Sequence, residues 1–336
     1  MKKYLLPNEG KFYKANLHCH TKVSDGGNTA KEMKDYYMAH GYSILAFTDH
    51  ELLVEHSELT DKDFVAITGY EYAFAAKGPW QETQSLELNF LARDPHNELH
   101  ICFDPNNVYH GEKWRVNTLE YAGDIYKRQF TKESIQHVID EAKRHGFIVS
   151  LNHPSYSFIT PEFFGNFKGL FAMEILNHGS YYRYFEYNVQ MYDQMLRMGN
   201  RISCIATDDN HCANVYDDET DPRPWGYTMV KLKELTYDNV IEALERGDHY
   251  ATQGPRIEEL YVEDGKVHLK CSEAVAVIMA TKNRYGKVIE APAHQRITEV
   301  TFDLPQDEYM RFEVVDAYGR RANTRGYFLD ELNLSE

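Results

Sequence analysis

Short apolar segments alternate with amphipathic segments up to about residue 250, and this alternation limits the folds open to the chain. Residues 29–41 place Thr29 and Glu32 at the spacing of a helix capping box and end at Gly41. Residues 131–146 repeat apolar side chains at helical spacing and stop at Gly146. Repeated strand–helix units of this kind predict an α/β fold with a parallel sheet, most economically a closed or nearly closed barrel.

The other predicted elements of this region follow the same order. Strands are expected at residues 43–50, 63–74, 147–154, 170–177, 201–211 and 226–232, and helices at 236–247 and, rich in tyrosine, roughly at 181–198. Residues 92–130 show no clear period, and a loop this long is usually functional, so we expect a lid or a pocket wall there.

The pattern changes near Gly254. Residues 255–336 read as alternating strands separated by turns that carry glycine or aspartate, with no helical stretch. We therefore predict a barrel domain over residues 1–254 and a small antiparallel β-sandwich domain over residues 255–336.

Charge and cysteine usage narrow the classes of function. A net charge of −16 argues against binding of nucleic-acid polymers or anionic membranes. It leaves room for a small phosphorylated substrate, because metal ions reverse the local sign of a pocket. Five scattered cysteines with no C-x-x-C pair, no long apolar run and no signal-peptide core predict a cytoplasmic protein, and a homo-oligomer is compatible with the sequence.

Metal-capable side chains end five of the predicted strands. They are His18 and His20, His50, Glu71, His153, and the group Asp208, Asp209 and His211. In a parallel barrel the carboxyl ends of the strands meet on one face, so these groups should converge. A single polar residue at a strand end is common. Five independent strands would not be expected to end in side chains that can bind a metal unless these residues act together.

The two-residue spacing of His18 and His20 places both rings on one face of a strand, and Asp209 and His211 repeat it. Glu71 has two oxygens and is suited to bridging two ions. Imidazoles and carboxylates without thiolates favour two or three ions of Zn, Mn or Fe, and Mg less. Cys19 and Asp208 should face away from the ions and be structural.

These residues resemble a known family. The segments "NLHCHTKVSDG", "FTDH", "GYEY", "LNHP" and "TDDNH" are similar to the ordered motifs of the polymerase and histidinol phosphatase (PHP) family, over roughly residues 12–250. The resemblance implies a distorted (β/α)7 barrel and a metal-dependent phosphoesterase. The C-terminal part looks like the β-domain of stand-alone bacterial members.

The resemblance also implies a distribution of ligands. One metal would be held by His18, His20, Glu71 and Asp209, a second by Glu71 and His153, and a third by Asp25, His50 and His211. The family usually has a further histidine for the second metal, where "SLELNFLA" offers Glu87 instead, and His96 or His100 only beyond it. Glu87 is therefore a tentative ligand.

Two substrate contacts are expected near the tyrosine-rich segment. His178 follows a predicted strand end, and the guanidinium of Arg183 matches phosphate geometry. The tyrosines of residues 179–188 could stack on a base, but packing is the more common use of such residues.

The primary hypothesis is hydrolysis of a phosphoester, in a small metabolite or nucleotide, by hydroxide formed on the ions, with His211 as tentative general acid. One alternative keeps the ions and cleaves an amide, carbamate or lactone, because no basic phosphate-binding cluster is evident. Another is a metal-binding module without enzymatic activity.

Overall fold

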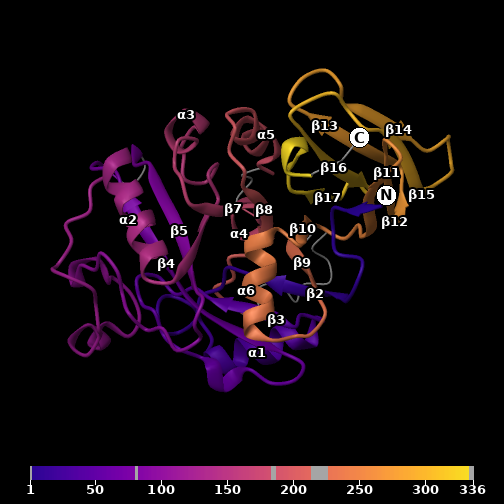
Figure 1. Ribbon diagram of the computed structural model, residues 1–336. Helices are drawn as coiled ribbons and strands as arrows, with labels where there is room; N and C mark the ends of the chain where they lie inside the picture. The colour runs from indigo at the N-terminus through magenta and orange to yellow at the C-terminus, as the bar shows by residue number, and fades with distance from the viewer. Residues whose placement is uncertain (1, 80–81, 183–186, 213–225, 333–336) are drawn as a thin grey trace.

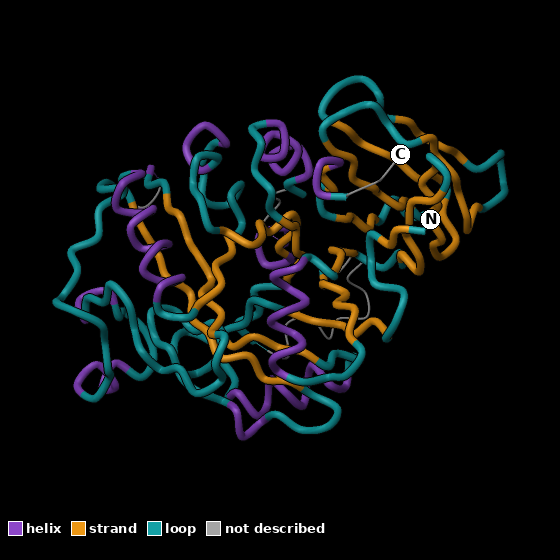
Figure 2. Tube along the Cα trace, in the orientation of Figure 1, coloured by secondary structure: helices purple, strands orange, loops and turns teal. Residues whose placement is uncertain are grey.

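The structure is a computed structural model that describes residues 2–79, 82–182, 187–212 and 226–332 (Figure 1). A larger α/β part adjoins a smaller part built from strands, and both chain termini lie at the smaller part. Figure 2 shows that helices lie along the outside of the larger part while strands run through its middle.

Most strands of the described chain belong to one sheet of 14 strands. Its order is β14-β13-β16-β17-β10-β9-β2-β3-β4-β5-β6-β7-β8, with β18 paired to β16. The bounds are β2 (Lys11–Asn16), β3 (Ile44–Phe47), β4 (Val65–Ala75), β5 (Ser85–Ala92), β6 (Phe147–Leu151), β7 (Leu170–Asn177), β8 (Ser203–Thr207), β9 (Tyr227–Leu232), β10 (His249–Thr252), β13 (Ala276–Thr281), β14 (Lys287–Glu290), β16 (Tyr309–Val315), β17 (Arg321–Thr324) and β18 (Tyr327–Phe328).

The direction of the strands departs from an all-parallel barrel. Strands β2, β3 and β4 are parallel, as are β6, β7 and β8, but β5 is antiparallel to both β4 and β6. A parallel connection needs a crossover of a dozen or more residues, usually with a helix. Residues 76–84 are too few for one, so β4 and β5 form an antiparallel pair.

The mixed α/β class is as predicted, whereas a closed (β/α)7 barrel is not what the backbone pairing shows. In the described residues no backbone ladder joins β8 to β9, so the sheet stays open there. A side chain spans the gap: Thr228 Oγ1 donates to the carbonyl of Ala206 (2.9 Å) and accepts from its N–H (3.1 Å).

The helices cover the outer face of the larger part. They are α1 (Ala30–Ala39), α2 (Lys132–Arg144), α3 (Pro161–Phe164), α4 (His178–Tyr182), α5 (Val189–Arg197) and α6 (Tyr237–Arg246), with 3-10 turns η1 (Ser57–Leu59), η3 (Pro105–Asn107), η4 (Lys113–Asn117) and η5 (Leu329–Glu331). The capping box of Thr29 and Glu32 is present at α1, as predicted, and the side chain of Thr131 caps α2. The predicted helix over 181–198 differs: α5 begins only after Asn188, and residues 183–186 lie outside the described residues.

The smaller part consists of two antiparallel layers. One layer is a separate sheet of β1 (Lys3–Tyr4), β11 (Ile257–Glu263), β12 (Lys266–Ala274) and β15 (Ile297–Asp303), in the order β1-β11-β12-β15. Buried side chains such as Leu260 and Leu269 pack against Phe312 and Val314 of the other layer. Since β17 pairs with β10, that second layer is continuous with the large sheet.

No helix in the described part of the chain is both long and apolar enough to span a membrane.

Candidate metal centre

The predicted ligands lie at one edge of the large sheet. His18 and His20 follow β2, His50 follows β3, Glu71 lies in β4, Glu87 lies in β5, His153 follows β6, and Asp209 and His211 follow β8. Because the carboxyl ends of parallel strands meet at the same edge, side chains distant in sequence are brought together there.

The direction of β5 explains how Glu87 reaches this edge. An antiparallel strand begins where its parallel neighbours end, and Glu87 lies near the start of β5. The register pairs Glu87 with Ala73 and Asn89 with Glu71. Glu87 is thus on the same side as Glu71, and its Oε2 lies 3.2 Å from His153 Nε2.

His18 and His20 face a common point, as their spacing predicts. Their Nε2 atoms are 3.1 Å apart. Oδ1 of Asp209 lies 3.3 Å from Nε2 of His18 and 3.1 Å from Nε2 of His20. Asp209 has a φ of +51°, in the left-handed region that non-glycine residues rarely adopt, and in this conformation its carboxylate lies against both rings.

Glu71 lies at the middle of the cluster. Its Oε1 is 3.3 Å from His18 Nε2 and 3.5 Å from His153 Nε2. Its Oε2 is 3.4 Å from His20 Nε2 and 3.1 Å from His50 Nδ1. The two oxygens of one buried carboxylate therefore face two different sets of imidazoles, which is the arrangement of a bridging ligand.

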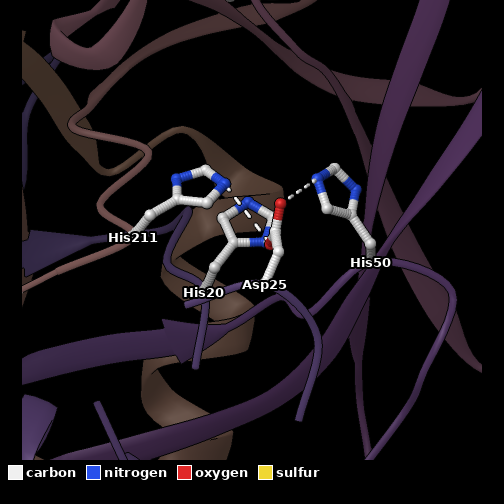
Figure 3. Close-up of side chains that lie close together, drawn as sticks. All are labelled: His20, Asp25, His50 and His211. Atoms are coloured by element: carbon white, nitrogen blue, oxygen red, sulfur yellow. Dashed lines mark ion pairs between the residues drawn. The ribbon is translucent and has the colours of Figure 1, made fainter. Parts of the chain in front are cut away.

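A third set of donors surrounds Asp25 (Figure 3). Its Oδ1 lies 3.4 Å from His211 Nε2 and 3.6 Å from His20 Nδ1, and its Oδ2 lies 3.7 Å from His50 Nε2. The three rings come from the ends of β2, β3 and β8 and point toward the carboxylate. In each of the sets Glu71–Glu87–His153, His18–His20–Glu71 and His20–Asp25–His50–His211, the ligand atoms lie within 4.8 Å of one another.

The protonation chemistry of the cluster fits cations. Burial lowers the pKa of His20 to about 4, so this ring is neutral at pH 7 and its nitrogens can act as ligands. Its Nδ1 is buried and has no hydrogen-bond partner among the described residues. Burial, together with the charge of Glu71, raises the pKa of Glu87 to about 7. Divalent ions would satisfy the buried nitrogen of His20 in one set of donors and displace the proton that Glu87 otherwise retains in another.

Glu174 in β7 orients two of these histidines. Its Oε1 lies 2.8 Å from His18 Nδ1, and its Oε2 accepts from the backbone N–H of His153 (2.8 Å). Thr207 and Asn177 also donate to it, at 2.7 Å and 2.9 Å. A carboxylate on the second nitrogen of an imidazole fixes the ring and increases its basicity as a ligand.

Asp49 holds the loop that carries Asp25. Its Oδ1 accepts from the backbone N–H of Thr21 (2.7 Å) and from the hydroxyl of Ser24 (2.7 Å). Its Oδ2 accepts from the hydroxyl of Thr21 (2.8 Å). The residue just before His50 therefore fixes the loop opposite it.

The cluster forms the floor of a cavity of about 380 Å³. Asn107, Tyr109 and His110, from the segment 92–130, contribute to its wall, together with Phe74 and Tyr156. The segment therefore adjoins the cluster, and the size of the cavity suits a small molecule rather than a polymer.

Arg128 ties the end of this segment to the cluster. Its Nη1 and Nη2 donate to Oε1 and Oε2 of Glu51, at 2.7 Å and 2.9 Å, and Nη1 also donates to the carbonyl of Ala73 (2.6 Å). The guanidinium stacks on the ring of Tyr72 at 3.7 Å. Glu51 follows His50 directly and has a φ of +62°, so this ion pair supports an unfavourable backbone conformation beside a candidate ligand.

Other predicted residues lie elsewhere. His100 is buried, and its Nε2 accepts from the N–H of Leu53 (2.9 Å), while the exposed His96 pairs with Glu55 (2.6 Å). Neither joins Glu71 and His153. His178 is buried at the start of α4 and does not line the cavity described above. Arg183 lies outside the described residues, as do residues 184–186 of the tyrosine-rich segment.

Cys19 and Asp208 face away from the cluster, as alternation along the chain predicts. Cys19 is buried in an apolar group with Met33 and Phe47. The carboxylate of Asp208 accepts from the hydroxyl of Tyr37 (2.7 Å) and from the amide of Asn16 (2.5 Å). Both residues pack behind the site.

Sequence reasoning missed Glu174, Arg128 and Asn152 as supporting residues. Asn152 donates to Glu71 Oε1 (2.7 Å). A signal existed for Glu174, because an acid inside the apolar strand "LFAMEILN" requires a buried partner. The sequence contains no such signal for Arg128, because residues 92–130 have no hydrophobic periodicity from which its position could be inferred.

Fold and site together define a mixed α/β protein with a candidate centre for metal ions at the strand ends of its large sheet. No family model matches the chain, and no curated protein matches it.

Comparison with solved structures finds matches at low identity. A two-domain protein from Bacteroides vulgatus, described as containing a predicted PHP-like metal-dependent phosphoesterase, is 15% identical, with a TM-score of 0.49 over 97% of this chain and 98% of that one. A presumed metal-dependent phosphoesterase from Bifidobacterium adolescentis is 16% identical, with a TM-score of 0.37 over 61% and 89%. An amidohydrolase from Chromobacterium violaceum, with bound sulfate and no metal, is 12% identical, with a TM-score of 0.41 over 59% and 87%.

Proposed function

We propose that this protein is a metal-dependent phosphoesterase that hydrolyses a small phosphorylated molecule. The observation that carries the proposal is the convergence of five imidazoles and three further carboxylates around Glu71 at the floor of a cavity. The motif resemblance to the PHP family supports it, and we read the run from β9 to β8 as an open form of the barrel that this resemblance implies.

The donor set assigns the ions to residues. His18, His20, Glu71 and Asp209 would hold one ion, Glu71, Glu87 and His153 a second, and Asp25, His50 and His211, with Nδ1 of His20, a third. Nitrogen and oxygen donors favour Zn, Mn or Fe. Such ions supply Lewis acidity, which activates a water molecule near neutral pH and offsets the charge of phosphoryl oxygens.

The chain's own residues position and move protons. Glu174 and Asn152 fix the orientation of His18 and Glu71, so the donors need no rearrangement. His211 is 40% exposed at the cavity wall, and when it does not hold an ion it can give a proton to a leaving oxygen. Burial alone would lower its pKa, but the hydrogen bond with Asp25 raises the pKa of His211 to about 9.

The second candidate keeps the centre and cleaves an amide, carbamate or lactone. It is favoured by the cavity lining, which in the described residues contains no lysine or arginine. Under the first proposal the ions themselves must bind the phosphate, so inorganic phosphate should inhibit. Under the second it should not.

A broad panel of phosphomonoesters, phosphodiesters and nucleotides, offered to protein loaded with Mn or Zn, tests the proposal. We expect turnover of at least one class, its loss in His18→Ala, and unchanged activity in His137→Ala, which lies on the exposed face of α2. No hydrolysis of any phosphoester by the metal-loaded wild type would contradict the proposal.

A further inference from the structure

A second cavity lies at the opposite end of the strands from the candidate metal centre. Its volume is about 250 Å³, and its wall includes Phe147, Leu170 and Ser203, the first residues of β6, β7 and β8. His153 lies beyond the other end of β6. At about 3.3 Å per residue, these two ends are separated by roughly 20 Å. The second cavity is therefore independent of the metal cluster.

The charge of its lining is opposite to that of the whole chain. Five cations line it, Arg93, Lys143, Arg201, Arg246 and Arg325, against a single described acid, Glu245. The chain as a whole carries a net charge of −16. A concave basic surface on an acidic protein concentrates anions locally.

Three of the five cations are neutralised by acids. Arg93 donates to Glu245 (2.5 Å). Arg201 donates to Asp330 (2.6 Å) and to Glu331, and Arg246 donates to Asp248 (2.8 Å) and to Glu242 (3.0 Å). These pairs fix the rim of the cavity and leave little free charge there.

Lys143 and Arg325 remain without an acidic partner among the described residues. For Arg325, the side-chain donor bond goes to the carbonyl of Gly326 (3.2 Å), and its Nε is buried with no hydrogen-bond partner in the described chain. Within the part of the chain that the structure describes, the guanidinium has no acid to neutralise it, and an oxyanion in the cavity supplies acceptors for its terminal nitrogens.

Two glycines make room for these two side chains. A Cβ at Gly169 would lie 2.6 Å from Cδ and 3.1 Å from Nζ of Lys143. A Cβ at Gly247 would lie 2.4 Å from Cδ and 2.7 Å from Nε of Arg325. Both glycines have a positive φ, +94° and +75°. The backbone thus leaves space where the two unpaired cations lie.

We propose that this cavity is a binding site for a small oxyanion, either inorganic phosphate or the phosphate group of a small metabolite, held by Lys143 and Arg325. The guanidinium fork and the ammonium group together match the charge and geometry of a phosphate. The site is separate from the proposed hydrolytic activity and does not depend on it.

Calorimetric titration of inorganic phosphate into the metal-loaded full chain tests the site. Lys143→Gln combined with Arg325→Gln should weaken binding at this site by at least about tenfold, because two charge-assisted contacts are lost. Arg144→Gln is the matched control: it is adjacent in sequence but pairs with Glu141, and it should leave the affinity unchanged. His18→Ala should also leave the affinity of this cavity for phosphate unchanged. This variant therefore distinguishes phosphate in the cavity from phosphate bound at the metal centre.

Glu245→Gln should change the phosphate affinity in the opposite direction. This variant tests the proposed site even if the double variant does not fold. It releases Arg93 and removes the acid, so phosphate should bind about two- to fivefold more tightly. Unchanged affinity in Glu245→Gln, or phosphate binding that His18→Ala abolishes entirely, would overturn the proposal. Titration with a phosphorylated sugar beside inorganic phosphate shows whether the free ion or an esterified phosphate is preferred.

Discussion

Glu87 is the candidate ligand that the sequence left most open, and the structure places it beside His153 and Glu71. It lies 3.2 Å from His153 and on the same face of the β4–β5 pair as Glu71, and burial with the charge of Glu71 raises its pKa to about 7. A carboxyl group that is half protonated in the absence of an ion is well suited to release its proton when one binds.

Glu87→Ala should remove one metal equivalent per chain and leave the others, because the sets around His18 and Asp25 do not include Glu87. Elemental analysis of the purified variant measures this. Glu299→Ala, on the exposed face of β15, is the control and should keep the metal content of the wild type. Equal metal content in Glu87→Ala and the wild type would show that Glu87 is not a ligand.

At the same scale, the ligands visible in the sequence were those with a positional signal. His18, His20, His50, His153 and Asp209 sit at or just past predicted strand ends, so their convergence followed from the parallel arrangement. Glu174 sits within a strand, where burial and the identity of its partner depend on the neighbouring strands. That information is not local, so its role in orienting His18 could not be predicted.

At the scale of elements, local signals predicted helices well and strand direction poorly. The capping box at Thr29 begins α1 as expected, because it depends on residues only three positions apart, and the apolar spacing of residues 131–146 predicted α2. The direction of β5 depends on the connection 76–84, and the opening between β8 and β9 depends on how the sheet curves. Neither leaves a periodic pattern in the sequence.

The connection between the segment 92–130 and the cluster gives a prediction at this scale. The side chains of Arg128 and Glu51 are 9% and 7% exposed. Arg128→Met would leave the Glu51 charge buried without its partner, so we expect a loss of about 3 kcal/mol or more in the free energy of unfolding. Urea denaturation measures this loss.

Arg115→Met is the matched control for this variant. Arg115 lies in the same segment but forms a more exposed pair with Glu112, so its replacement should cost less than about 1 kcal/mol. Equal effects of the two substitutions would mean that the Arg128–Glu51 pair does not anchor the segment.

At the scale of the whole molecule, a buried histidine remote from the candidate centre should make stability depend on pH. His249 in β10 is 1% exposed, and burial lowers its pKa to about 4. The unfolded chain takes up this proton near pH 6.5, whereas the folded chain does not until about pH 4. Stability is therefore unaffected above pH 6.5 and falls as the pH drops from 6.5 toward 4.

The contribution of His249 can be isolated by substitution. Between pH 7.5 and pH 5, the wild type should lose about 2 kcal/mol more than His249→Gln, measured by urea denaturation with chelator present so that no metal ion titrates. His137→Gln, exposed on α2, should behave as the wild type. Parallel pH profiles for the wild type and His249→Gln would contradict the assignment.

The central claim is that the strand-end cluster holds divalent ions, and elemental analysis of the wild-type chain purified without chelator tests it most directly. We predict two or three equivalents of Zn, Mn or Fe per chain. His18→Ala should lose most of the metal, because His18 and Glu71 belong to adjoining sets of donors. Less than one equivalent in the wild type after loading with Zn or Mn, or a metal content that His18→Ala leaves unchanged, would contradict it.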